Sequence, residues 1–379
     1  MPEIALLSEK METLKKVKTC AICGKNGGVS LALGVCRPCI LDNYQSAERY
    51  ILEAHSRVRA EFGLPATPPK RGISCTQCVN MCLISEGEIG YCGVRKGKRG
   101  HVVHLSSKGA IVEWYHDPLP TNCVADFVCP AGTGCGYPKY SKRKGAEHGY
   151  RNLAVFYGAC NFSCLFCQNW QFRNLTKSKT PLLSAEELAS KADDKTTCIC
   201  FFGGDPTPQI EHALKTSQII IEGKDVMRIC FETNGSMNRK FLKKMAEASY
   251  SSGGCIKFDL KTWHSNLNKA LCGVDNRWTL SNFRWLADFE KRKEDRGVPF
   301  LVASTLLVPG YIEKEEVAEI AKFIASLNPE IPYSLLAFSP RFHMTDLPPI
   351  SGKTAKDCLK EARSAGLKKV RLGNIHLVV

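Results

Sequence analysis

The sequence predicts an α/β fold, a partial barrel of six parallel strand–helix units with cysteine-rich metal-binding extensions on its N-terminal side. Three observations support this prediction. Short apolar runs of β-forming residues recur from about residue 150, helical patterns lie between them, and the 20 cysteines of the 379-residue chain gather in clusters. The loops that follow the strands should carry the chemistry, because they meet at one face of such a barrel.

Composition and spacing divide the chain into three regions. We expect a zinc-ribbon-like module plus a helix in residues 1–65, a cysteine-rich segment in 66–149 and a core domain in 150–379. The helix is expected because Tyr44, Ile51 and Val58 have helical spacing. The Pro-rich stretch LPATPPKRG is typical of a linker.

The core domain follows from a regular alternation of patterns. Its expected strands are LAVFYG, CICFFGG, RICFETN, CIKFDL, LVASTLLVPG and YSLLAF, with GLKKVRLGNI as a candidate for one more. Its expected helices are SAEELASKA, QIEHALKTSQIII, RKFLKKMAEAS, LSNFRWLADFEK and EKEEVAEIAKFIASL. Strands that alternate with helices indicate parallel pairing.

The bulk properties narrow the class of protein. No apolar run of about 18 residues exists, so we expect no membrane span. The N-terminal MPEIALLSEKMETLKK has no apolar signal region, which favours a reducing cytoplasm, where clustered cysteines are metal ligands. The formal net charge of +15 is compatible with an acidic protein partner, with RNA or with a plain solvated surface.

The stretch YGACNFSCLFCQNW carries three cysteines, Cys160, Cys164 and Cys167, spaced C-x3-C-x2-C after the first expected strand. A four-iron cluster needs one ligand per iron, so three cysteines leave one iron open for a substrate or cofactor. The alternative is a zinc site completed by a distant residue.

At this point the sequence resembles the radical S-adenosylmethionine (SAM) superfamily, closest to the glycyl-radical-enzyme activating group that includes pyruvate formate-lyase activating enzyme. The resemblance covers about residues 70–379. It rests on CNFSCLFCQNW with an aromatic before the last cysteine, then FFGGDP, ETNG, DLK, LLVPGYIEKEEV and SPRFHMTDLPP with AGLKKVRLGNIH. The family prefers Glu where this chain has the Asp of GGDP.

The resemblance implies a role for each matching residue. The three cysteines would hold a [4Fe–4S] cluster, and SAM would occupy the open iron. Contacts to SAM or to a nearby cation are implied for Phe166, Gln168, Gly203, Gly204, Asp205, Glu232, Thr233, Asp259, Lys261 and His343. A strand-end salt-bridge set is the alternative for the acidic residues and the lysine, and a loop cap is the alternative for the histidine.

The implied reaction begins with one low-potential electron from a flavodoxin or ferredoxin type of donor. SAM is then cleaved to methionine and a 5′-deoxyadenosyl radical, which removes hydrogen from a substrate. The substrate stays open between a glycyl radical enzyme, another protein, RNA and a small metabolite. The alternative class of function is a non-catalytic iron–sulfur carrier or a zinc-dependent nucleic-acid-binding protein, which would not need GGDP, ETNG and DLK.

The remaining cysteines predict further metal sites. The C-x2-C-x12-C-x2-C set Cys20, Cys23, Cys36 and Cys39 predicts zinc. The C-x2-C-x3-C-x9-C set Cys75, Cys78, Cys82 and Cys92 fits zinc or a closed [4Fe–4S] cluster equally. The set Cys123, Cys129 and Cys135 has no assignment, with a further cluster and free loop thiols as alternatives. The cysteines inside expected strands, Cys198, Cys200, Cys230 and Cys255, read as small buried hydrophobes.

Overall fold

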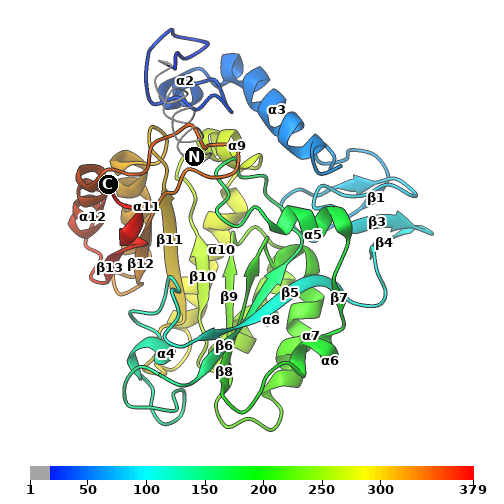
Figure 1. Cartoon of the computed structure of the whole chain (residues 1–379), viewed down its shortest axis with the longest axis vertical. Helices are drawn as coiled ribbons and strands as arrows, with labels where there is room; N and C mark the ends of the chain where they lie inside the picture. Colours follow the sequence, from blue (N-terminus) through cyan, green and yellow to red (C-terminus); the bar gives the residue numbers. More distant parts are fainter. Residues whose placement is uncertain (1–17) are drawn as a thin grey trace, which may run out of the picture.

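A nine-stranded sheet is the centre of the molecule in this computed structural model, which describes residues 18–379 (Figure 1). The strand order is β13-β12-β11-β10-β9-β8-β6-β5-β7, and the seven strands from β13 to β6 are parallel to one another. The sheet strands are β5 (Ala110–Pro118), β6 (Arg151–Tyr157), β7 (Leu182–Leu183), β8 (Thr196–Gly203), β9 (Arg228–Thr233), β10 (Ile256–Asp259), β11 (Leu301–Leu307), β12 (Tyr333–Ala337) and β13 (Val370–Gly373).

Helices cover one face of this sheet. They are α6 (Ala185–Ala189), α7 (Ile210–Ile221), α8 (Arg239–Ser251), α10 (Arg277–Lys291), α11 (Lys314–Leu327) and α12 (Gly352–Ser364). Outside this layer lie α5 (Phe172–Ser178), α9 (Ser265–Cys272) and the 3-10 turns η1 (Thr207–Gln209) and η2 (Ile375–Leu377). Helix α6 begins with a capping box between Ser184 and Glu187. The main core lies between the helices and alternate strand residues such as Ile199, Phe231 and Phe258.

The predicted fold class is confirmed. Each of the six expected strands is present as β6, β8, β9, β10, β11 or β12, and the candidate stretch GLKKVRLGNI contains β13. Strand β5 was not expected, because it lies between cysteine-rich stretches. It pairs antiparallel with β6 along seven residues, so part of the cysteine-rich segment belongs to the central sheet.

The N-terminal elements gather at the carboxyl ends of the parallel strands. They are α2 (Arg37–Asp42), α3 (Tyr44–Ala60) and the two hairpins β1 (Ile73–Ser74) with β2 (Leu83–Ile84) and β3 (Arg95–Lys98) with β4 (His101–His104). The Tyr311 hydroxyl group donates to the backbone oxygen of Val35 at 2.9 Å. A second core joins Val29, Ile51 and Val58 of this region to Phe162 and Leu165 of the three-cysteine loop.

The opposite end of the sheet is covered by the loop between β5 and β6, which contains the short helix α4 (Pro130–Thr133). Figure 1 shows α4 far from α2 and α3. Within residues 18–379, no helix is both long enough and apolar enough to cross a membrane. The stretch MPEIALLSEKMETLKK, on which the expected lack of a signal segment rests, lies outside the described residues.

Candidate functional site

The three cysteines of the first strand-end loop line a cavity of about 130 Å³. Cys160, Cys164 and Cys167 follow β6, and among the described residues they are the cysteines that line this cavity. The structure brings nearly all of the sequence-predicted residues to the same cavity: Phe166, Gln168, Gly203, Gly204, Asp205, Glu232, Thr233, Asp259 and Lys261. The prediction that these motifs meet at one face follows from parallel strands ending together.

Backbone hydrogen bonds fix the three-cysteine loop. The amide nitrogens of Ser163 and Leu165 donate to the backbone oxygens of Cys272 and Leu271 at 2.8 and 2.9 Å. From the N-terminal extension, the Asn80 side chain donates to the backbone oxygen of Asn161 at 2.7 Å. The loop is therefore held by α9 and by the cysteine-rich segment as well as by its own strand.

The thiols of this loop are too far apart to form one compact ion site. In a tetrahedral zinc site, Zn–S bonds of about 2.3 Å place the sulfurs about 3.8 Å apart. Among the described residues, one group of His, Cys, Asp and Glu gathers its ligand atoms within 4.8 Å, and the strand-end cysteines are not that group. A donor set of three spread thiols fits a cluster that presents a different iron to each of them.

The polar wall opposite the thiols contains a tight ion pair. Lys261 Nζ lies 2.6 Å from Asp259 Oδ2, and the Ser304 hydroxyl donates to the other carboxylate oxygen at 2.7 Å. Burial lowers the pKa of Lys261, but the carboxylate of Asp259 outweighs it and raises the pKa, so the ammonium group stays charged. Burial raises the pKa of Glu232 on the next strand.

Asp205 is buried, and its carboxylate already has protein partners. Its Oδ1 accepts from the backbone nitrogen of Thr207 at 2.8 Å, and its Oδ2 accepts from the Thr233 hydroxyl at 2.9 Å. The backbone nitrogen of Asn234 donates to Oδ2 at 2.8 Å. Burial raises the pKa of Asp205, although these hydrogen bonds act to lower it. The residue ties the end of β8 to the end of β9, a role the sequence did not reveal.

The two glycines before Asp205 are required by the backbone itself. Gly203 has a φ of +94°, which only glycine adopts freely. A Cβ on Gly204 would lie 2.0 Å from the backbone oxygen of Ala159. The sequence predicts that these glycines let the chain approach SAM, and the structure adds a close approach between two neighbouring strand ends.

His343 does not line the cavity that the other predicted residues share. Its Nε2 lies 3.4 Å from Glu61 Oε2, at the end of the N-terminal helical region. Its backbone nitrogen donates to the backbone oxygen of Leu165 at 3.2 Å. The histidine thus braces the outside of the three-cysteine loop.

Two residues at the site have no signal in the sequence. Arg173, on α5, lines the cavity while it is buried against the rings of Phe62 and Phe342, and its Nε has no hydrogen-bond partner among the described residues. Cys272, at the end of α9, adjoins Cys164, and its thiol lowers the pKa of Cys164. Sequence separation hides both contacts, because neither residue belongs to a strand-end motif.

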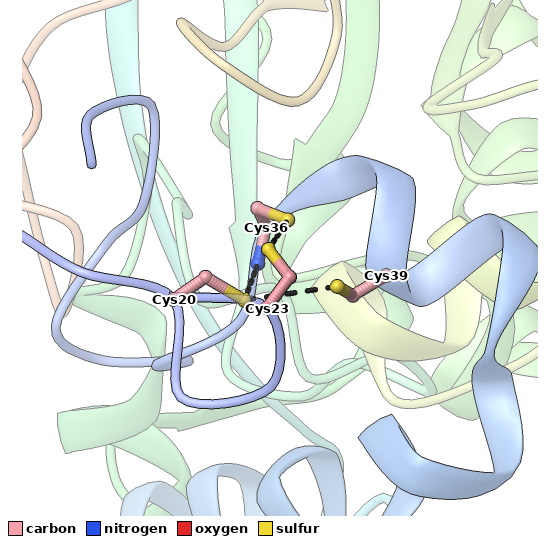
Figure 2. Close-up of side chains that lie close together, drawn as sticks. All are labelled: Cys20, Cys23, Cys36 and Cys39. Atoms are coloured by element: carbon pink, nitrogen blue, oxygen red, sulfur yellow. Dashed lines mark hydrogen bonds between the residues drawn. The ribbon is translucent and has the colours of Figure 1, made fainter. Parts of the chain in front are cut away.

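The four N-terminal cysteines form a compact group. Figure 2 shows their side chains converging, with Cys20 Sγ 3.8 Å from Cys39 Sγ and Cys23 Sγ 3.7 Å from Cys36 Sγ. All four sulfurs lie within 4.8 Å of one another. This spacing fits a single tetrahedral ion with four thiolate ligands.

The second four-cysteine set is arranged differently. Cys75, Cys78, Cys82 and Cys92 line one small cavity, which Arg95 also borders. Their sulfurs do not meet the 4.8 Å limit that the N-terminal group meets. The four cysteines thus surround one space, and zinc and a closed cluster stay the two predictions for this set.

The remaining cysteines separate into two environments. Cys135 donates to the backbone oxygen of Val128 at 3.3 Å and lies on another surface hollow. Cys123 and Cys129 instead line a larger cavity of about 460 Å³. Of the strand cysteines, Cys198, Cys200 and Cys255 are buried, as predicted. All four of the set also line this cavity, a feature that their sequence pattern did not indicate: Cys198, Cys200, Cys230 and Cys255.

Comparisons with known proteins agree with this geometry. The radical SAM superfamily matches residues 154–324. The chain is 25% identical to the uncharacterized protein MJ0808 of Methanocaldococcus jannaschii over 309 residues, 80% of this chain and 81% of that protein. It is 26% identical over 184 residues to a protein of the same organism provisionally named glycyl-radical enzyme activating enzyme MJ1632, covering 47% of this chain and 64% of that one.

A solved structure is also similar. A domain of pyruvate-formate lyase-activating enzyme from Bacteroides vulgatus is 20% identical and superposes with a TM-score of 0.37, covering 46% of this chain and 98% of that domain. Residues 154–324 thus match the radical SAM superfamily, and the chain resembles the glycyl-radical-enzyme activating group of that superfamily.

Proposed function

We propose that the strand-end cavity holds a [4Fe–4S] cluster on Cys160, Cys164 and Cys167, with SAM on the fourth iron, and that the chain is a radical SAM enzyme. The observation that carries the proposal is the meeting of three spread thiols with a half-buried ion pair in one cavity, within the region that matches the radical SAM superfamily. Bound there, the cluster and SAM would supply the radical chemistry of hydrogen abstraction.

The protein groups around the cavity position SAM. The charged Lys261, oriented by Asp259, suits the carboxylate of the methionine end. The Gln168 amide donates to the backbone oxygens of Phe166 and Ser339 at 2.9 and 3.1 Å, which fixes the segment proposed to face the adenine. Glu232 and Thr233 complete the acidic and polar side.

Asp205 has two proposed tasks. Its hydrogen bonds to Thr207, Thr233 and Asn234 hold the ends of two strands together. Its carboxylate, on the cavity wall beside the glycine turn, is also the proposed acceptor for the SAM ammonium group. His343 contributes by bracing the three-cysteine loop, while its contact with the nucleoside stays a prediction.

The proposed substrate is a glycyl radical enzyme, which would lose a hydrogen atom from a glycine residue. The name of MJ1632 supports this choice, with 64% of that protein covered. A flavodoxin or ferredoxin type of donor would supply the electron. Cys20, Cys23, Cys36 and Cys39 are proposed to hold zinc, because their spacing fits a single ion.

The experiment is anaerobic reconstitution followed by reduction with dithionite in the presence of SAM. We expect 5′-deoxyadenosine and methionine from the native protein and none above background from Cys164→Ala. A matched control is Cys358→Ala, because Cys358 is a buried cysteine of α12 in the main core. Absence of 5′-deoxyadenosine in the native protein, or its persistence in Cys164→Ala, would reject the proposal and favour a non-catalytic iron–sulfur protein.

A further inference from the structure

A second, larger cavity of about 460 Å³, the interior cavity, lies against the sheet face opposite the main core and adjoins the strand-end cavity. The two cavities share wall residues, among them Phe202, Glu232 and Leu306. Outside the three cysteine sets already described, the chain has nine cysteines, and six of them line this cavity. They are Cys123, Cys129, Cys198, Cys200, Cys230 and Cys255.

Strand geometry places four of these thiols on one wall. Alternate residues of a strand point to opposite faces, so Cys198 and Cys200 of β8 face the interior while Ile199 and Phe201 pack in the main core. Cys200 is paired in register with Cys230 of β9. Cys255 precedes β10, and its backbone oxygen accepts from the nitrogen of Phe231, the residue after Cys230.

The other two thiols, Cys123 and Cys129, belong to the loop between β5 and β6, which is held by hydrogen bonds to the sheet. Arg371 donates to the backbone oxygen of Cys123 at 2.7 Å, and the Ser334 hydroxyl donates to that of Val124 at 2.7 Å. Further along the loop, Glu147 forms a buried two-fold pair with Arg228 at 3.0 and 2.6 Å. The loop that contains Cys123 and Cys129 is therefore held in place by three separate strands of the sheet.

The six thiols are not equivalent. Cys123, Cys129, Cys230 and Cys255 pack in one contact group around Ala125 and Val302. Cys198 donates to the side-chain oxygen of Asn152 at 3.3 Å, which uses its proton in a neutral hydrogen bond. Two cysteines from the loop, one from β9 and one directly before β10 thus line one cavity.

The charge in the cavity points to an anionic group. Lys257 is almost completely buried, and its Nζ lies 3.1 Å from Cys123 Sγ, 2.9 Å from Cys200 Sγ and 3.6 Å from Glu232 Oε2. A buried ammonium group is costly unless anions surround it, and neutral thiols are weak acceptors. Thiolates bound to metal would supply the negative charge that this lysine otherwise receives from Glu232 alone.

The spacing and size of the site indicate which metal group fits. Among residues 18–379, the interior cysteines do not form a group within 4.8 Å, as a single tetrahedral ion would need. Soft thiolate ligands select iron–sulfur clusters among the groups that are larger than one ion. We propose that the interior cavity holds an additional iron–sulfur cluster ligated by Cys123, Cys129, Cys230 and Cys255, with Lys257 beside it.

The test compares two ligand pairs in the full-length chain that also carries Cys160→Ala, Cys164→Ala and Cys167→Ala, so that the strand-end cluster is absent. After anaerobic reconstitution with iron and sulfide, iron and acid-labile sulfide are counted per chain. Cys123→Ser with Cys129→Ser should lose about two to four irons, the content of one cluster. Cys230→Ala with Cys255→Ala should lose the same number.

Cys198→Ser is the matched control, because this cysteine lines the same cavity without being a proposed ligand, and its iron content should be unchanged. The loop pair lies outside the strands, so it decides the test if the strand pair does not fold, as judged by circular dichroism. Iron contents equal to the parent in the folded loop pair, an equal loss in Cys198→Ser, or zinc in place of iron would each overturn the proposal.

Discussion

The N-terminal cysteine group and the strand-end cysteine loop use the same ligand atom in opposite ways. At the N-terminus, the four cysteine side chains converge (Figure 2), and their sulfurs lie within 4.8 Å of one another. At the strand ends, three sulfurs spread around a cavity that Asp259, Lys261 and Arg173 also line. In the proposed metal-bound states, the first group would saturate an ion with protein ligands, whereas the second would leave both a coordination position and charged groups for a bound molecule.

This difference teaches that the count of cysteines and their convergence have to be considered together. A closed set contributes to folding, because metal binding to ligands that are brought together only in the folded chain stabilises that chain. A set with one ligand too few leaves a metal position at which a substrate or cofactor can bind. The two regions are nevertheless packed in one core, in which Val29 and Ile51 join Phe162 and Leu165.

The largest expected difference between the two cysteine groups is in their contribution to the stability of the fold. Cys36→Ser should remove the N-terminal zinc and lower the free energy of unfolding by several kcal/mol, since zinc binding supplies about 10–16 kcal/mol in isolated zinc fingers. Zinc analysis and urea unfolding measure the two effects. Because Cys36 does not line the strand-end cavity, reduced protein that still folds should cleave SAM as before. Loss of SAM cleavage in folded Cys36→Ser would show that the two regions are not separable.

The packing of α3 on α9 predicts a pH effect between the two regions. His55 is buried with its Nε2 3.0 Å from the backbone oxygen of Ala270, and burial lowers its pKa to about 4. A histidine whose pKa is lower in the folded chain than in the unfolded chain contributes to stability in full when the pH is above the unfolded-state pKa of about 6.5. This contribution is lost as the pH falls from about 6.5 towards the folded-state pKa of about 4. The loss is about 3 kcal/mol at most.

Urea unfolding at pH 7 and at pH 5 measures this loss. His55→Gln keeps a donor for Ala270 without a titrating ring, so it should show a smaller fall in stability over the same range. Release of zinc in acid affects both proteins equally. An identical pH dependence in the two proteins would remove His55 from the account.

The smallest expected effect concerns the polar wall of the strand-end cavity. Lys261→Met should weaken SAM binding by about 10- to 100-fold, the equivalent of one hydrogen bond to a charged group. The cluster should still assemble, because no proposed ligand is altered. A binding titration monitored by EPR measures the change, with the exposed Lys322→Met on α11 as control. Unchanged affinity in Lys261→Met would mean that the lysine only pairs with Asp259.

Much of the fold and of this cavity could be predicted because strand-end motifs are local in sequence. Parallel strands end at one edge, so the loop after β6 and the ends of β8, β9 and β10 had to meet. Contacts between distant segments could not be predicted. Arg173 stacks on Phe62 and Phe342, and Cys272 reaches Cys164 from α9, both through tertiary packing alone.

The interior thiols show the same limit. Cys198 and Cys230 match a strand pattern, and nothing local indicates that a loop presenting Cys129 lies against them. The roles of Gly204 and Asp205 were also only partly visible, because the backbone of Ala159 and the nitrogen of Asn234 come from other strand ends. Local patterns indicated which residues are special, and packing decided what they contact.

The most direct test of the open and closed sites is the EPR spectrum of the dithionite-reduced protein with and without SAM. SAM should change the cluster signal of the native protein and of Cys36→Ser, because only an open iron accepts a new ligand. It should change nothing in Cys164→Ala. A native spectrum that SAM leaves unaltered, or a SAM-dependent change that survives in Cys164→Ala, would contradict the account.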